Sequence, residues 1–193
     1  MLSDQTAQQP DITRSIRDAD ADDLQFALAG GGIPLIRMLS TGERSMTDVI
    51  IRKAKASDEA RWRLLWAGYI AFYRASVPED VTASSWRQIL DPASNIHALV
   101  AEKDGIVIGL CNYVFHDSTW SMQPICYLQD LFVDPATRGG GAAKKLILAC
   151  EDEAKAKGAF RLYWQTQEYN APARSLYDTI TPRSSFIVYR KNI

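Results

Sequence analysis

The sequence predicts an α/β protein built on an α+β mixed sheet, with helices on both faces of the sheet. Three observations predict this class. The expected elements begin with a run of antiparallel strands and end in an alternation of helices and strands. Asp104-Gly105 between two β-type runs is a strong hairpin signal. The 193 residues are 47% hydrophobic and 23% charged, which is typical of a globular domain that buries a sizeable core.

The first half of the fold follows from hydrophobic periodicity. A strand comes first, and Ser57, Asp58 and Glu59 then resemble a helix N-cap with acids in the first turn. Apolar and aromatic residues recur at helical spacing as far as Tyr73, and a shorter helix ends before Pro92. The predicted elements are residues 49–52 (strand), 57–73 (helix), 82–90 (helix), 97–102 (strand) and 106–115 (strand).

The second half continues the strand pattern and then alternates. Gly158 is a natural stop for the helix before it. The predicted elements are residues 125–133 (strand), 143–157 (helix), 160–166 (strand), 171–179 (helix) and 185–190 (strand). A Rossmann domain would alternate from its start, so the order argues against it.

Composition excludes several classes of function. The 22 Lys and Arg balance 23 Asp and Glu, so no overall charge favours nucleic acid or an anionic membrane as a partner. No apolar run approaches a bilayer span and no signal peptide opens the chain, so we expect a cytoplasmic protein. Three cysteines without CxxC spacing and two isolated histidines argue against a disulfide scaffold and against a structural metal site.

The first 45 residues differ from the rest of the chain. They are acidic overall, polar and Gln-rich at their start, and interrupted by Gly30-Gly31-Gly32. We predict a mostly disordered extension over residues 1–45, with a short helix over residues 21–28 as the alternative, and a domain over residues 46–193.

A glycine-rich turn carries the clearest chemical signal. The strand over residues 125–133 leads into Gly139-Gly140-Gly141, which opens the next helix. Free N–H groups and the positive end of the helix dipole make such a turn a cradle for phosphate, and Arg138 can add a charge-assisted bond. The alternative is a turn without a ligand. A Walker loop needs a Lys followed by Ser or Thr, and a dinucleotide fingerprint needs other glycine spacing, so both are disfavoured.

Two linked motifs resemble those of the GNAT superfamily of acetyl-CoA-dependent N-acetyltransferases. Arg138, Gly141 and Ala143 match [RQ]-x-x-G-x-[GA]. The second motif, N-x-x-A-x-x-[LF]-Y, is matched by Asn170, Ala173, Leu176 and Tyr177. The stretch around Asp130 is similar to the branch of diamine and histone/polyamine acetyltransferases. The resemblance covers about residues 48–193 and implies a central twisted mixed sheet.

The resemblance also implies where acetyl-CoA, the cosubstrate, binds without a metal. Backbone groups of one strand segment would pair with the pantetheine arm: Leu131, Phe132 and Val133. Amides of the turn would hold the pyrophosphate: Arg138, Gly139, Gly140, Gly141, Ala142 and Ala143. Asn170 would bond the pantetheine arm, and Arg174 is either a phosphate contact or a solvated charge.

Acid–base chemistry would fall to two residues. The resemblance implies that the phenol of Tyr177 protonates the departing thiolate. Asp130 is the first candidate for the base, with a structural carboxylate or a cation-recognition group as its alternatives. Related acetyltransferases often have Glu where this chain has Gln129, which cannot accept a proton at neutral pH. Glu168 is a weaker candidate, and a covalent acyl-cysteine is disfavoured.

The predicted function is acetyl transfer from acetyl-CoA to a primary amine by direct attack in a ternary complex. The acceptor would be a small amine, a polyamine or a lysine-bearing molecule, with aromatic residues of the first helix available to line its pocket. A homodimer is left open. Two rival interpretations are a CoA-binding module without turnover and a nucleotide-binding regulatory domain.

Overall fold

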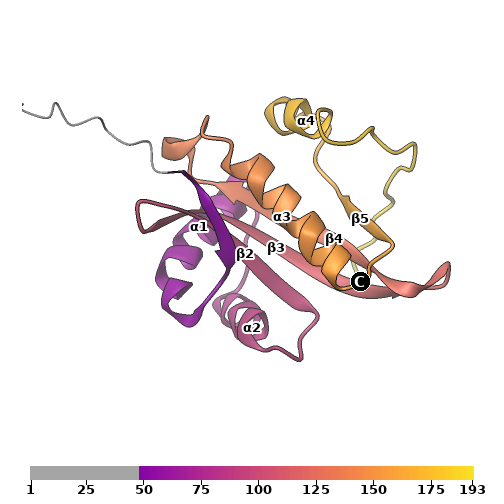
Figure 1. Cartoon of the computed structure of the whole chain (residues 1–193), viewed down its shortest axis with the longest axis horizontal. Helices are drawn as coiled ribbons and strands as arrows, with labels where there is room; N and C mark the ends of the chain where they lie inside the picture. The colour runs from indigo at the N-terminus through magenta and orange to yellow at the C-terminus, as the bar shows by residue number, and fades with distance from the viewer. Residues whose placement is uncertain (1–47) are drawn as a thin grey trace, which may run out of the picture. The chain divides into compact units, whose positions relative to one another are not determined.

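A five-stranded sheet organises residues 48–193, the part of the chain that the computed structural model describes (Figure 1). The strands lie in sequence order: β1 (Ile50–Lys53), β2 (Ile96–Lys103), β3 (Ile106–Ser118), β4 (Ser121–Val133) and β5 (Arg161–Trp164). Neighbours from β1 to β4 are antiparallel, and β4 and β5 are parallel. The predicted mixed sheet is confirmed, and its one parallel pair lies where the alternating half of the chain begins.

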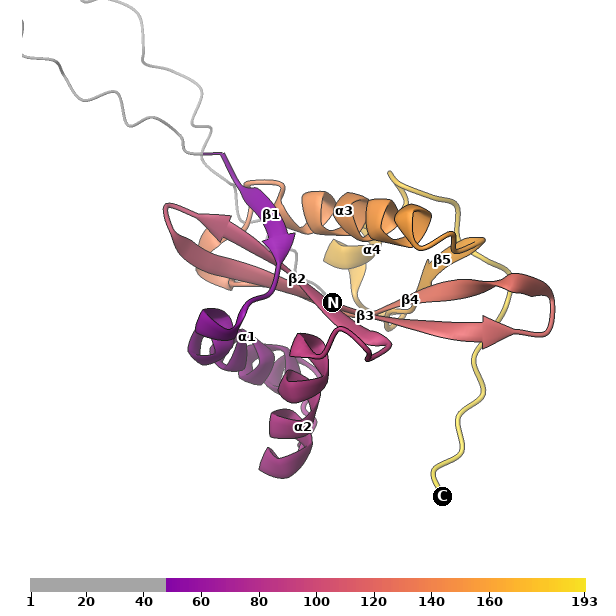
Figure 2. The same cartoon turned by 60° about the horizontal axis from the view of Figure 1, so that its bottom comes forward.

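The sheet contains two antiparallel hairpins, and the first follows from local sequence. Asp104 and Gly105 have φ of 53° and 76°, which gives the left-handed pair that a tight hairpin between β2 and β3 requires. The hairpin of β3 and β4 is much longer and projects past the end of the other strands (Figure 2). Its tip carries Trp120, whose side chain is exposed.

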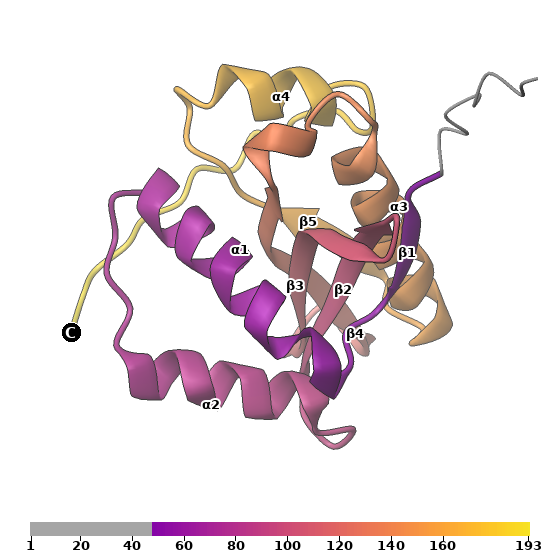
Figure 3. The same cartoon turned by 90° about the vertical axis from the view of Figure 1, so that its left-hand side faces the viewer.

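The α-helices cover the sheet from both sides (Figure 3). One face packs against α1 (Glu59–Phe72) and α2 (Glu79–Leu90), and the other against α3 (Ala142–Ala156). A last helix, α4 (Ala171–Tyr177), follows β5 and adds Leu176 and Tyr177 to the edge of the α3 core. Within residues 48–193, no helix combines the length and the apolar character that crossing a membrane requires.

The core under α1 is built from large aromatic residues. Trp62 is fully buried, and its ring lies 5.0 Å from that of Trp86 of α2. Gly68 lets α1 approach β4 closely, because a Cβ at this position would lie 2.9 Å from the Phe132 ring. Close packing at this point therefore fixes the part of β4 that follows Asp130 against α1.

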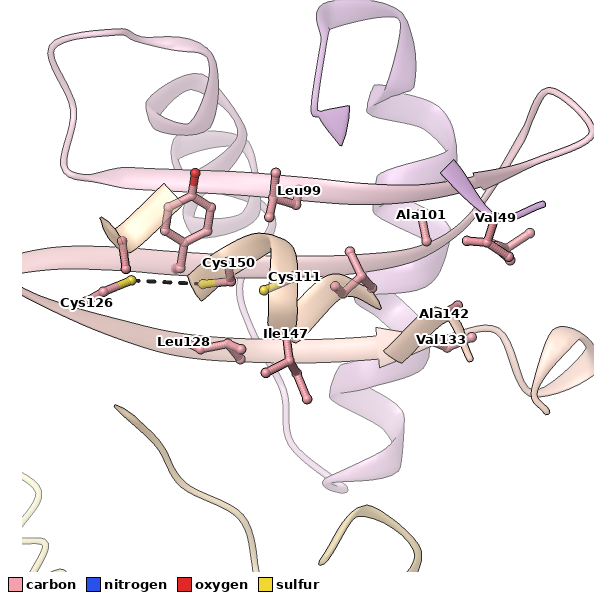
Figure 4. Close-up of a cluster of buried hydrophobic side chains, with 14 of the residues drawn as sticks. Val49, Leu99, Ala101, Cys111, Cys126, Leu128, Val133, Ala142, Ile147 and Cys150 are labelled. Atoms are coloured by element: carbon pink, nitrogen blue, oxygen red, sulfur yellow. Dashed lines mark hydrogen bonds between the residues drawn. The ribbon is translucent and has the colours of Figure 1, made fainter. Parts of the chain in front are cut away.

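The core under α3 contains the three cysteines (Figure 4). Cys126 Sγ of β4 lies 3.9 Å from Cys150 Sγ of α3, and Cys111 of β3 lies beside them. All three are buried free thiols. The pKa of Cys126 is raised by its hydrogen bond with Cys150 and by burial, and the pKa of Cys150 is raised by its hydrogen bond with Cys111 and by burial. Cys126 and Cys150 therefore keep their protons and serve as packing residues.

Most of the predicted elements are present in the structure, with ends shifted by a few residues. The sequence places Asp58 in the first turn of the helix, but the structure begins α1 one residue later, and the Asp58 side chain does not cap it. Its carboxylate instead accepts hydrogen bonds from Arg52 of β1 and from the Lys55 N–H. The acid that the sequence assigns to the first helical turn therefore joins the start of α1 to the edge of the sheet.

The predicted strand over residues 185–190 is wrong. The structure gives this segment no strand, and its large apolar side chains are exposed: Phe186, Ile187, Val188 and Tyr189. β-propensity describes how well a residue fits a half-buried pleated surface, so an apolar run without a pairing neighbour has no strand to join. The predicted extension over residues 1–45 and the alternative helix over residues 21–28 lie outside the described residues.

Candidate active site

The sheet opens into a fork between β4 and β5. Their parallel pairing runs from Ile125 and Arg161 to Leu128 and Trp164, where β5 ends. Directly after Leu128, the pairing of β4 with β3 shifts by one residue, so that Gln129 forms a β-bulge. Beyond the bulge, β4 keeps β3 on one side and has no strand on the other among the described residues.

The unpaired side of β4 exposes the backbone of two residues. The Asp134 N–H donates to the Ile108 carbonyl at 2.8 Å, so this pair faces β3. Backbone groups of a strand alternate in direction, so those of Phe132 also face β3, while those of Leu131 and Val133 point to the open side. An extended ligand can therefore form strand-like hydrogen bonds there. Of the three residues assigned to this role from the sequence, Phe132 contributes its ring to the core instead.

The open edge leads into the glycine turn at the start of α3. Gly139 and Gly141 have φ of 92° and 75°, and a Cβ on either residue would meet no atom within 4 Å. The N–H groups of residues 138–141 make no backbone hydrogen bond to another described residue. Those of Ala142 and Ala143 lie in the first helical turn, where they have no partner inside the helix. A row of free donors around empty space fits a pyrophosphate.

A pocket of about 350 Å³ adjoins this turn. Its wall includes Gly68 and Phe72 of α1, the Phe132 ring and the exposed Arg138. The Arg138 side chain makes only a weak bond of 3.4 Å to the Val133 carbonyl. Its charge therefore stays available to an anion at the pocket mouth.

Two residues of the second motif make local contacts. The Asn170 side chain precedes α4 and donates to Thr166 Oγ1 at 3.0 Å. The Arg174 guanidinium donates to the Glu168 carbonyl at 2.8 Å, so it braces the loop that leads into α4. Of the two, Asn170 lies closer in sequence to the end of β5, where the fork opens.

Tyr177 lies at the fork. Its ring packs edge-on against Trp164, the last residue of β5, with 5.5 Å between the ring centres. Burial raises the pKa of the phenol to about 12, so the group keeps its proton at neutral pH. No described residue hydrogen-bonds its hydroxyl, which is therefore free to donate to a ligand.

Asp130 lies on the α1 face of β4 and is 7% exposed. Its carboxylate accepts from Asn112 Nδ2 at 3.1 Å and from the Tyr69 hydroxyl, and Asn112 Oδ1 in turn accepts from Trp62 Nε1 at 3.2 Å. Burial raises the pKa of Asp130, and the hydrogen bonds from Asn112 and Tyr69 oppose this shift. A carboxyl group with a raised pKa suits proton exchange with an amine.

A pair of tyrosines links Asp130 with Tyr177. Tyr69 packs edge-on against Tyr73 with ring centres 5.0 Å apart, and Tyr73 interacts electrostatically with Tyr177. Tyr69 therefore contacts one of the two groups that the sequence selects for acid–base chemistry, and Tyr73 lies within electrostatic range of the other.

The remaining sequence candidates lie elsewhere. Gln129 and Glu168 are exposed. The backbone carbonyl of Glu168, and not its carboxylate, accepts the hydrogen bond from Arg174. His97 packs among Tyr113 and Phe115, and burial lowers its pKa. The raised pKa values of Cys126 and Cys150 leave neither residue with the thiolate that a covalent mechanism needs. Residues 48–193 contain no group of three or more His, Cys, Asp or Glu side chains that could hold a metal ion.

Sequence reasoning missed Asn112. This buried residue joins α1 to Asp130. The sequence feature that could have identified it is an amide side chain in an otherwise apolar strand. Arg61 was missed as well: it pairs with Asp134 at 2.5 Å and donates to the Val107 carbonyl, which holds α1 against the end of β4. No local sequence pattern marks such a long-range pair.

An open strand edge that runs into a turn with free N–H donors has the length and the donors to suit a long phosphorylated carrier of an acyl group, as acyltransferases use. Comparison with known families specifies the group. The chain belongs to the acetyltransferase (GNAT) family, whose profile matches residues 60–179. The fold class, the resemblance and the enzyme class expected from the sequence are thereby confirmed.

Several relatives are named as N-acetyltransferases. The chain is 29% identical over 153 residues to a D-amino-acid N-acetyltransferase of Saccharomyces cerevisiae, covering 78% of this chain and 95% of the relative. An uncharacterized N-acetyltransferase of Bacillus subtilis is 37% identical over 128 residues, which is 66% of this chain and 85% of that one. A thialysine N-epsilon-acetyltransferase of Bos taurus is 34% identical over 92 residues, 44% of this chain and 54% of the relative.

Solved structures show the same fold. The chain is similar to an aminoglycoside N-acetyltransferase, AAC(6')-Iy, in complex with CoA, at a TM-score of 0.61 and 25% identity over 76% of this chain and 97% of that one. The same enzyme with a bisubstrate analogue gives a TM-score of 0.65 at 24% identity, covering 76% of this chain and all of the other. Acetyl transfer to amines is therefore the activity of the family to which this chain belongs.

Proposed function

We propose that this protein transfers the acetyl group of acetyl-CoA to the primary amine of a small or lysine-bearing acceptor, by direct attack in a ternary complex. The observation that supports this most is the continuity of the open β4 edge with the glycine turn. The edge offers strand-like bonds to an amide-bearing arm, and the turn offers donors to a pyrophosphate at the end of that arm.

In this proposal acetyl-CoA is held by the backbone of Leu131 and Val133, by the turn amides from Arg138 to Ala143 and by the Arg138 charge. Asn170 bonds the pantetheine arm as it passes the end of β5. Arg174 supports the loop beneath it or contacts a phosphate. The pocket lined by Phe132 and Arg138 gives the arm an apolar wall.

The chemistry needs one proton donor and one acceptor. The amine nitrogen attacks the thioester carbon, a C–N bond forms, the C–S bond breaks, and the products are an amide and the thiol of CoA. Tyr177 donates its proton to the departing sulfur, and Asp130 receives the proton that the amine loses. The raised pKa of each group suits its role, because one must be protonated at neutral pH and the other must bind a proton readily.

The substrates named for the relatives indicate the general class of the acceptor molecule. Amino acids, thialysine and aminoglycosides are named as substrates of relatives, and all carry a primary amine. We extend this common feature, a primary amine on a small polar molecule, to the present chain.

Asp130→Asn tests the base. We expect the variant to lose rate mainly near neutral pH and to recover partly at high pH, where more of the free amine is already deprotonated. A pH–rate profile of wild type and variant with the best amine from a panel provides the measurement. Raised acceptor KM with an unchanged kcat at every pH would assign Asp130 to recognition alone.

Removal of residues 1–45 tests the proposed domain boundary. All described strands and helices begin at Ile50 or later, so we expect the truncated protein to melt cooperatively and to bind acetyl-CoA as the full chain does. Calorimetric melting and an acetyl-CoA titration of both proteins provide the comparison. A truncated protein without a cooperative transition would contradict the boundary.

A ligand panel tests the function as a whole. Ligands that bind only the folded state raise the melting temperature, so CoA and acetyl-CoA should stabilise the protein more than ATP or NAD does. A thiol-release assay with amines then separates an enzyme from a CoA-binding module without turnover. Preferential stabilisation by ATP or NAD would favour the nucleotide-binding alternative and overturn the proposal.

A further inference from the structure

The sheet has two edges, and the edge at β1 is closed to a further strand. The Ala54 N–H faces β2, and backbone groups of a strand alternate in direction, so the carbonyls of Val49 and Lys53 point outward. Both carbonyls accept hydrogen bonds from long basic side chains, from Lys145 Nζ at 3.2 Å and from Arg52 Nη1 at 3.1 Å. Charged side chains of this kind protect an edge against further pairing.

The other edge, at β5, is open. The Phe160 N–H donates to the Pro124 carbonyl of β4 at 3.1 Å, so the backbone groups of Arg161 and Tyr163 point away from β4. No residue within 48–193 forms a hydrogen bond with these outward groups. The edge therefore offers free N–H and C=O groups to a strand from another chain.

The C-terminal segment, residues 185–190, has the composition of such a strand. Its four consecutive apolar side chains are between 61% and 89% exposed: Phe186, Ile187, Val188 and Tyr189. The segment runs on the α1 side of the sheet, and the chain ends away from the strands (Figures 2 and 3). Side chains of these types fit a pleated surface, and a run of them in solvent is unfavourable. The segment thus lacks only a strand to pair with.

The hairpin of β3 and β4 adds apolar surface at the same end of the sheet. Ile125 of β4 pairs with Arg161, the first residue of β5, so the hairpin tip extends past the start of β5 (Figure 2). Trp120 and Met122 at this tip are 81% and 100% exposed. A strand added along β5 can extend past its start to these two side chains.

We propose that this end of the molecule is an interface with a second copy of the chain. Residues 185–190 of each copy add as a strand to β5 of the other, and Trp120 and Met122 cover the added strand. The strand and the open edge belong to one chain, which makes the surface self-complementary, as a two-fold interface requires. The inference does not depend on the proposed function.

The size of the exposed side chains fits a stable dimer. Trp120, Phe186 and Tyr189 can each bury about 150 Å², so these three supply roughly half of the ~800 Å² that one partner buries in a standard interface. Met122, Ile187 and Val188 add to this area. The proposed contact therefore needs no further rearrangement of the described fold.

Sedimentation equilibrium of the full chain tests the proposal. At about 10 μM we expect about twice the 21.6 kDa of one chain, since a Kd of about 1 μM leaves most chains paired. Hydrogen exchange should show protected amides at residues 185–190 and at Arg161 and Tyr163, with this protection lost on dilution. The dimer should persist at saturating CoA, because the cosubstrate is assigned to the open side of β4.

Two variants of Val188 separate strand pairing from side-chain character. Val188→Pro removes an N–H and does not fit the interior of a strand, so the Kd of the dimer should rise at least about tenfold. Val188→Thr keeps the N–H and the β-branch and should remain dimeric. Because Val188 is exposed in the single chain, both variants should keep the fold, which circular dichroism and CoA affinity verify.

Variants at the two ends of β3 test the hairpin. Trp120→Ser should weaken the dimer, while Ile106→Ser removes an exposed apolar side chain at the opposite end of β3 and should leave the dimer unchanged.

Four results would overturn the inference. A chain that stays monomeric at about 100 μM has no such interface. A monomer with protected amides at residues 185–190 would show that the segment returns to β5 of its own chain. A dimer that Val188→Pro leaves intact uses another surface, and a dimer that CoA dissociates uses the open side of β4.

Discussion

Tyr177→Phe is expected to lower kcat about 100-fold while the Kd for CoA barely changes. The substitution keeps the ring that packs at 5.5 Å against Trp164 and removes only the hydroxyl, which no described residue holds. If that hydroxyl supplies the proton to the departing thiolate, its loss affects the transition state and leaves cosubstrate binding intact. Steady-state kinetics with a CoA titration of the same sample provide both numbers.

A matched control is Tyr189→Phe, which removes the hydroxyl of a highly exposed tyrosine and should keep the wild-type kcat. A pre-steady-state burst would show that product release limits turnover, so the rate of the first turnover is compared in that case. A Tyr177→Phe enzyme with a wild-type chemical step would remove Tyr177 from the mechanism.

Gly141→Val is expected to weaken CoA binding about 100-fold, the sum of a strained backbone and a blocked approach. Gly141 has φ of 75°, a conformation that a β-branched residue rarely adopts, and its missing Cβ leaves open space where the pyrophosphate would lie. Calorimetric titration of CoA into wild type and variant gives the ratio of Kd values.

Gly158→Val controls for strain. Gly158 has the same φ of 75° and also meets no atom within 4 Å, but it follows the opposite end of α3. This variant should lose comparable stability and keep its affinity for CoA. Equal losses of CoA affinity in the two valine variants would show that strain, and not contact with the cosubstrate, is responsible.

Arg138→Ala should have a smaller effect than Gly141→Val. Loss of a charge-assisted hydrogen bond costs about 1.5–3 kcal/mol, and the low end of this range, roughly a tenfold change in Kd, applies to an exposed side chain such as Arg138. The effect should shrink as ionic strength rises, because Arg138 is exposed. Unchanged CoA affinity in both Arg138→Ala and Gly141→Val would refute the phosphate site.

Local patterns predicted the parts of the fold that depend on neighbouring residues. Asp104-Gly105 defines its hairpin because the turn needs two residues with positive φ, and Gly158 ends α3 for the same reason. The strand expected over residues 185–190 failed because pairing needs a partner strand, which residue type does not supply.

The site was predictable in part. The glycine turn and Tyr177 lie on motifs of fixed spacing, so a linear pattern finds them. Asn112 bonds Asp130 from a different strand, and Trp62 reaches Asn112 from α1 across 50 positions of sequence. Such contacts depend on the register of β3 on β4 and on the angle at which α1 crosses the sheet. A local sequence pattern predicts neither property.

The bulge at Gln129 makes one residue of β4 dispensable for the register of the strand. Gln129 is exposed, so a change of its side chain alters few contacts. Tyr113 pairs with Leu128 and the next residue of β3, Asn112, pairs with Asp130, so deletion of Gln129 would leave a regular ladder in which Asp130 still points to the α1 face. The bulge is therefore an insertion that the sheet absorbs locally, and a β4 shortened by this one residue should keep its pairing with β3 on both sides of the deletion.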